Sequence, residues 1–272
     1  MELCHGTEPD QEIEDTMSAL FNDADADVVF RSRDKIRFRI YSTYLKNTTG
    51  GFPPVGFTPH EDEIVDLDEN ASTLNLMFQF VYPQPQPPLR TLDFPTLSSL
   101  AEAVEKYQIY PAMQICYVFM TKALPSHALD ILDYAIKHDY YPLMDKAAPH
   151  ISLEDVSSAA TRVSPRLLQI WIPYHNACNQ ALRDAFKINE PHKRPRSSFE
   201  SCTEWETRRA SILITLGGCI GVKNVESALA SIACTSPDCC REAAVAWQAK
   251  ARQGIAKPPK FSTFSRKSFQ DD

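Results

Sequence analysis

The amino-acid sequence predicts an α+β fold in which a small sheet flanked by helices precedes a mostly α-helical C-terminal region. Residues 28–40 alternate apolar and polar side chains at the period of two that is typical of strands. From residue 95 onward, apolar residues recur almost throughout at helical spacing. Hydrophobic residues make up 43% and charged residues 23% of the 272 residues, which is typical of a chain with a packed core.

Composition also excludes several classes of protein. The net charge of −7 argues against broad electrostatic binding to nucleic acid or to an anionic membrane. No run of apolar residues approaches the 18 or so that a membrane-spanning helix needs. The acidic N-terminus lacks the basic flank and apolar run of a signal peptide. We therefore expect a cytoplasmic or nuclear protein whose eight cysteines are thiols or metal ligands.

The N-terminal segment, residues 1–19, is acidic. From Met1 to Phe30 the chain contains nine acids and no Lys or Arg. Within EIEDTMSALFN, at 12–22, the residues Ile13, Met17, Leu20 and Phe21 recur at helical spacing, and the acids of the first turn complement a helix dipole. The pattern predicts a helix over 12–22.

The next elements are strands. VVFRS and KIRFRI are separated by the polar turn Arg33-Asp34, and Ile36, Phe38 and Ile40 alternate with charged residues. This predicts a β-hairpin with one buried face. Residues 47–61 combine Gly, Pro and Asn and predict a long loop, after which IVDL at 64–67 predicts a short strand.

Helices fill most of the remaining chain. Ser72 is the expected N-cap of a helix that carries Leu74, Met77, Phe78, Val81 and Tyr82 on one face. The Pro-rich residues 83–89 end it and predict an extended linker. Ser152 and Asp155 form a variant of the capping box. Further helices are predicted at 95–108, 111–122, 125–138, 152–160 and 165–187.

Changes in composition divide the chain further. We expect the first domain over 20–125, a helical extension over 126–187 and a polar, Pro-containing linker over 188–203. A Cys-containing helical lobe is expected over 204–257 and a mobile tail over 258–272, where the composition is typical of turns.

Several motifs resemble one known family. DADVVFRS followed by KIRFRIYSTYLK resembles the opening of a BTB/POZ domain, with its Asp-Val-x-Phe signature at 27–30. IVDLDENASTLNLMFQFVYP, at 64–83, is similar to the family's strand and helix that follow. The segment at 101–150 resembles the helical continuation found in BTB proteins of mushroom-type fungi. The resemblance covers roughly residues 20–150.

The resemblance implies a non-catalytic protein-interaction module that is commonly a homodimer. Some members are substrate adaptors of cullin-type ubiquitin ligases, and others regulate transcription. In many members an N-terminal helix packs against the partner subunit, which makes Met17, Leu20 and Phe21 candidates for self-association. Asp27 corresponds to a family Asp near the dimer surface. In the alternative reading, the apolar stripe covers the subunit's own core and Asp27 is a polar cap before a strand.

Two positions depart from the family pattern. Tyr41 stands where the family usually has His, and a Gly/Pro loop follows Leu45 in place of a helix of small residues. The region 47–63 lacks the hydrophobic-x-Glu motif of cullin-binding members. We therefore expect self-association and recruitment of an unidentified partner protein, with a cullin adaptor as the first alternative. The second is a transcription-linked nucleic-acid binder that uses the C-terminal Cys-containing lobe.

One group of residues has the chemistry of a metal site. Cys234 and Cys239 flank a Pro-Asp turn that could bring thiolates to a tetrahedral Zn²⁺, with His175 and Cys178 as further ligands. Cys202 and His192 are alternative ligands. In the competing reading, His175 and Cys178 belong to a stripe of helix packing and no zinc is bound. A structural zinc would be the only cofactor.

Motifs of enzymes are missing from the sequence. It contains no G-x-S-x-G, no G-x-x-x-x-G-K-[ST], no H-E-x-x-H and no G-x-G-x-x-G after a strand. GGCIG at 217–221 lies between two helical patterns, where a helix-joining turn explains it better than phosphate binding. The sequence therefore predicts a protein that is not an enzyme.

Overall fold

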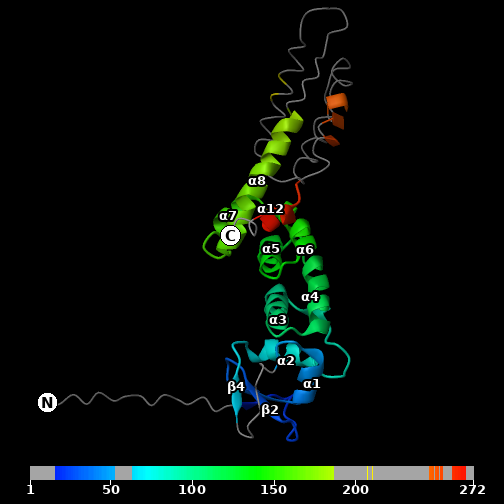
Figure 1. Ribbon diagram of the computed structural model, residues 1–272, viewed down its shortest axis with the longest axis vertical. Coiled ribbons are helices and arrows are strands. Elements are labelled where there is room, and N and C mark those ends of the chain that lie inside the picture. The colour runs from blue at the N-terminus through cyan, green and yellow to red at the C-terminus, as the bar shows by residue number, and fades with distance from the viewer. Residues whose placement is uncertain are drawn as a thin grey trace, which may run out of the picture. The chain divides into compact units, whose positions relative to one another are not determined.

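The structure is a computed structural model in which the chain forms two compact units, Met1–Lys122 and Ala123–Asp272 (Figure 1). Each unit is described by itself. The residues that the structure describes are 16–52, 63–186, 207, 210, 245–247, 249–250, 252–253 and 259–267.

The described residues of the first unit form a four-stranded mixed sheet. Its order is β1-β3-β2-β4, so β1 and β4 are the edges. β2 and β3 are antiparallel, with Phe30 opposite Phe38, whereas β1 runs parallel to β3 and β4 parallel to β2. A small mixed sheet combined with helices is the α+β class that the sequence predicts. The strands are β1 (Thr16–Met17), β2 (Val28–Arg31), β3 (Ile36–Ile40) and β4 (Ile64–Asp66).

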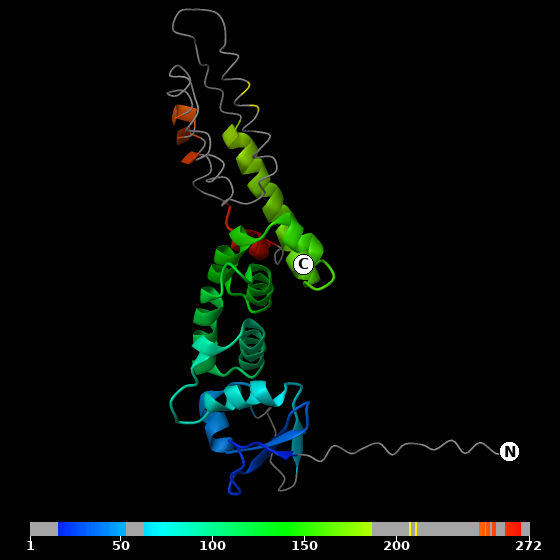
Figure 2. The same ribbon diagram turned by 180° about the vertical axis from the view of Figure 1, so that it is seen from behind.

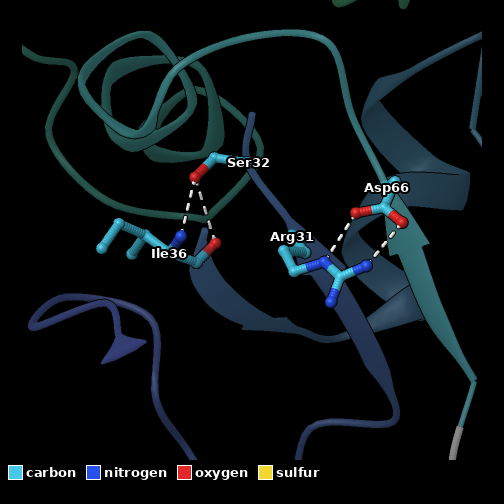
Figure 3. Close-up of polar contacts among 4 residues, drawn as sticks. All are labelled: Arg31, Ser32, Ile36 and Asp66. Atoms are coloured by element: carbon cyan, nitrogen blue, oxygen red, sulfur yellow. Dashed lines mark hydrogen bonds and ion pairs between the residues drawn. The ribbon is translucent and has the colours of Figure 1, made fainter. Parts of the chain in front are cut away.

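The predicted β-hairpin is confirmed as β2 and β3. Ser32 closes its turn: the Ser32 hydroxyl donates to the Ile36 carbonyl at 3.2 Å and accepts the Ile36 N–H at 3.0 Å (Figure 3). On β2, the Arg31 guanidinium makes a two-pronged ion pair with Asp66 of β4, at 2.6 and 2.7 Å. These contacts hold the three strands in register.

The predicted helix at 12–22 is wrong over its described part, residues 16–22. Thr16 N–H donates to the Lys35 carbonyl at 3.3 Å, and Ser18 N–H donates to the Arg37 carbonyl at 2.7 Å. The Phe21 carbonyl in turn accepts the Arg39 N–H at 2.9 Å. Backbone groups that a helix would pair internally are thus bonded to Lys35 and β3. The apolar spacing at 17–21 marks no helix face, since only Phe21 of its three apolar residues is buried.

Helices α1 and α2 lie along the sheet in both views, and α3 and α4 follow them (Figures 1 and 2). The residue pattern did not predict α1, whose last two residues fall within the expected 47–61 loop. It also misplaced the N-cap of α2: Asn70, not Ser72, accepts the Thr73 N–H at 2.9 Å. The helical elements of this unit are α1 (Ser42–Thr48), α2 (Ala71–Gln79), the 3₁₀ turn η1 (Leu89–Thr91), α3 (Phe94–Lys106) and α4 (Tyr110–Lys122).

An aromatic core joins the sheet to α2. Phe78 of α2 is fully buried, and its ring centroid lies 5.5 Å from that of Phe30 and 5.6 Å from that of Phe38. Phe52 also packs against Phe30, with ring centroids 5.2 Å apart, and stacks on Tyr107 at 4.2 Å. Side chains from both strands of the hairpin thus converge on α2, as the predicted single buried face requires.

The second unit is helical in its described residues. The helices predicted at 125–138, 152–160 and 165–187 are confirmed as α5, α7 and α8, and the capping box of Ser152 and Asp155 is present. Helix α6 was not predicted. The helical elements here are α5 (Ala128–Lys137), α6 (Tyr141–Ala147), the 3₁₀ turn η2 (Ala148–His150), α7 (Leu153–Ser158), α8 (Pro165–Phe186) and α12 (Phe261–Lys267).

The prediction of a mobile tail over 258–272 is wrong for α12. This helix packs on α6 and α8, and Phe261 is only 1% exposed. Asp145 of α6 accepts hydrogen bonds from the backbone N–H and the hydroxyl of Ser262, at 2.9 and 3.0 Å.

The predicted linker at 188–203 lies outside the described residues, as does most of the Cys-containing lobe. In the ranges that the structure describes, no helix is long and apolar enough to cross a membrane.

Candidate self-association and recruitment surface

Ser18 fixes the path of the chain after β1. It is 3% exposed, and its hydroxyl accepts the N–H groups of Leu20 and Phe21, both at 3.3 Å. The same hydroxyl donates to the Asn75 side chain on α2 at 3.0 Å. This buried turn points Phe21 inward and leaves the residues on either side of Ser18 at the surface.

The four candidate self-association residues therefore divide into different environments. Phe21 is 5% exposed, and its ring lies 5.8 Å from Phe78 and 5.3 Å from Tyr82. Met17 is 41% and Leu20 is 64% exposed. For Phe21 the structure agrees with the alternative reading, in which the apolar stripe covers the subunit's own core. Met17 and Leu20 remain accessible to a second copy.

Met17 also lies on an edge strand. The Thr16 N–H bonds to Lys35, just before β3, and the Ser18 N–H bonds to Arg37 of β3. The backbone N–H and C=O of Met17, between them, therefore point away from β3. Among the described residues, no strand covers this side of β1. An open strand edge is thus flanked by two exposed apolar side chains, Met17 and Leu20, which together we call the β1 edge surface.

Asp27 has a structural role that the sequence reasoning did not identify. Its carboxylate accepts the Ser42 backbone N–H at 2.7 Å and the Ser42 hydroxyl at 2.6 Å, which caps the start of α1. Burial raises the pKa of Asp27, but these hydrogen bonds and the charge of Lys46 together lower it by more. The pKa of Asp27 therefore lies below its usual value. Asp27 precedes β2, as the polar-cap reading holds, but the element that it caps is a helix.

Three tyrosines form a surface feature that the sequence analysis missed. Tyr41, Tyr44 and Tyr82, here called the tyrosine cluster, are half-buried, with ring centroids 4.8 to 6.5 Å apart and ring planes at 52 to 78°. Tyr41 was noted only as a departure from the family His, and Tyr82 only as part of a helix stripe. Because α1 was not predicted, nothing in the sequence pattern brought the three residues together.

Acidic residues border the tyrosine cluster. The Tyr41 hydroxyl donates to the Asp23 carboxylate at 2.6 Å. This hydrogen bond raises the pKa of Tyr41 to about 12 and holds the pKa of Asp23 below its usual value. Burial raises the pKa of the Tyr82 hydroxyl, and the charges of Asp23 and Asp27 raise it further. Both hydroxyls therefore lie close to negatively charged carboxylates.

The predicted zinc ligands are only partly described. On α8, the His175 ring stacks on Trp171 at 4.5 Å, and burial lowers its pKa. Burial raises the pKa of the Cys178 thiol, also on α8, which disfavours the thiolate. Cys234 and Cys239 lie outside the described residues. Within the described ranges, no three His, Cys, Asp or Glu side chains come together as metal ligands, so the zinc site stays a prediction.

Comparison with known proteins gives no match, either to a protein-family model or to a curated protein. The resemblance to BTB/POZ domains therefore depends on the sequence motifs.

Proposed function

We propose that this chain is a non-catalytic, BTB/POZ-like interaction protein that self-associates through the β1 edge surface and recruits another protein. The observation that carries the proposal is the exposure of Met17 and Leu20 beside a strand edge that no described strand covers. Proteins usually shorten, charge or cover such edges, because open edges pair with other chains. The apolar side chains of Met17 and Leu20 beside the β1 edge favour its pairing with a second copy of the chain.

The energetics of a two-fold interface support this use of the surface. In such an interface the same patch is buried on both copies, so each residue contributes twice. Fully burying a Met or Leu side chain contributes about 1.5–3 kcal/mol, so covering the exposed parts of Met17 and Leu20 contributes about 1 kcal/mol each. Four such side chains supply a useful apolar centre, and strand pairing adds backbone hydrogen bonds.

The buried neighbours keep this surface in place. Phe21 anchors the turn in the aromatic core, and Ser18 ties it to Asn75. A surface that is already ordered loses little conformational entropy on binding. This favours association without a prior folding step at residues 16–22.

Light scattering of the full chain tests the proposal. The expected molar mass is twice the chain mass of 30.7 kDa. A mass equal to that of a single chain at all concentrations would overturn the proposal. A cullin and nucleic acid are not proposed as partners, because no observation in the described residues favours either.

A further inference from the structure

The tyrosine cluster has the composition of a binding surface. Tyr44 and Tyr82 are in contact, with ring centroids 4.8 Å apart, and Tyr41 meets the Tyr44 ring edge-on at 5.8 Å. All three are only partly buried. Tyrosine is enriched among the residues that dominate protein interfaces, because its ring is large, rigid and amphipathic.

The charges around the tyrosine cluster indicate the sign of its ligand. Asp23 and Asp25 are exposed at its border, and no described residue forms a hydrogen bond or ion pair with the Asp25 carboxylate. Two cations are near: Arg39 donates to the Ala24 carbonyl at 3.1 Å, and Lys46 interacts with Asp27. A carbonyl does not neutralise the charge of Arg39, but the carboxylates of Asp23, Asp25 and Asp27 outnumber these two cations, so the border of the cluster still favours a cationic ligand.

We propose that the tyrosine cluster, with Asp25, binds an arginine-rich extended segment of a partner protein. A guanidinium stacks on an aromatic face and forms a two-pronged pair with a carboxylate, whereas the strongly hydrated lysine ammonium does neither as well. The contact between Tyr44 and Tyr82 leaves no space for a cation between their rings, so the guanidinium lies on the solvent-exposed side of the cluster. This inference rests on the proposed function, since it names the chemistry of the recruited partner.

The test measures fluorescence anisotropy of the full chain with a labelled twelve-residue peptide of alternating Arg and Gly. We expect Tyr44→Leu and Asp25→Asn each to weaken binding by about twofold to fivefold, as is typical of exposed cation–π contacts and ion pairs. Tyr44→Phe keeps the ring and should bind like the native chain. The matched controls are Tyr110→Leu, at an exposed tyrosine elsewhere in the unit, and Glu63→Gln, at an exposed acid.

The outcomes are decisive in both directions. Weaker binding by Tyr44→Leu and Asp25→Asn, with native binding by Tyr44→Phe and both controls, supports the proposal. Equal binding of a Lys–Gly peptide, or no effect of Tyr44→Leu, overturns it. Light scattering on the same samples separates the two proposals: a dimer that does not bind the peptide refutes this inference alone, and a monomer that binds it refutes self-association alone.

Discussion

Asp27 and Ser42 are fifteen residues apart in the chain and are joined by two hydrogen bonds, at 2.7 Å from the Ser42 backbone N–H and at 2.6 Å from its hydroxyl. The pair connects the residue before β2 to the first residue of α1. It also fixes α1, and therefore Tyr44, relative to the hairpin. One carboxylate thus links the sheet to the tyrosine cluster.

Replacing Asp27 by Ala should lower the free energy of unfolding by about 1 kcal/mol, as for the loss of a helix-capping side chain. Urea unfolding of the native and Asp27→Ala chains measures this change in the free energy of unfolding. The control is Glu63→Ala, since Glu63 is exposed and no hydrogen bond of its side chain is seen in the described residues. Equal urea midpoints for the Asp27→Ala and native chains would refute the capping role.

The contribution of Asp27 should also depend on pH. Its pKa is lowered in the folded state from an ordinary value of 3.8, so its stabilisation is fully present well above pH 3.8 and is lost as the pH falls through the lower folded value. The difference in stability between the native chain and Asp27→Asn should therefore shrink in acid. If this stability difference instead grows below pH 3.8, the pKa of Asp27 is not lowered by folding.

Gly51 should tolerate substitution less well than its neighbour Gly50. A Cβ at Gly51 would lie 2.7 Å from the Tyr107 carbonyl oxygen, a backbone atom that accepts the Gly51 N–H at 3.1 Å. A Cβ at Gly50 would meet only the side-chain ends of Gln108 and Tyr110, which can move. We expect Gly51→Ala to cost about 1–3 kcal/mol, as overpacking does. Equal melting temperatures for the two Ala variants would contradict this.

Phe261 should be required for the stability of the second unit. Its ring lies 5.1 Å from that of Tyr174 on α8, and replacing a buried Phe by Ala typically costs about 3–5 kcal/mol. Thermal unfolding of Phe261→Ala is compared with Lys260→Ala, which changes an exposed side chain just before α12. If both variants unfold at the native temperature, α12 does not stabilise the unit.

The sequence predicted those elements whose signals are local. The β2–β3 hairpin follows from alternation and a polar turn, and the Ser152 capping box follows from spacing alone. Helix α1 begins where Asp27 caps Ser42, and α12 is held by Asp145 from 117 residues away. Those contacts join segments distant in the sequence, so no short window of residues reveals them.

The candidate surface, too, depends on contacts that a short window of residues does not reveal. Met17, Leu20 and Phe21 have a spacing that fits one face of a helix, yet bonding of the backbone to β3 gives Phe21 an environment opposite to that of its neighbours. The tyrosine cluster combines residues 41, 44 and 82, and it forms only once α1 and α2 are folded. Periodicity identifies which residues are apolar, but tertiary contacts decide which of them are left exposed.

The most direct test of self-association is sedimentation equilibrium of three full-length chains: the native chain, the double variant Met17→Glu with Leu20→Glu, and Ile172→Glu. Ile172 is the matched control because it is an exposed apolar residue, at 56%, in the second unit. The account predicts a dimer, of twice the 30.7 kDa chain mass, for the native chain and for Ile172→Glu, and a single-chain mass for the double variant. A monomeric native chain, or a double variant that remains dimeric with unchanged circular dichroism, would contradict it.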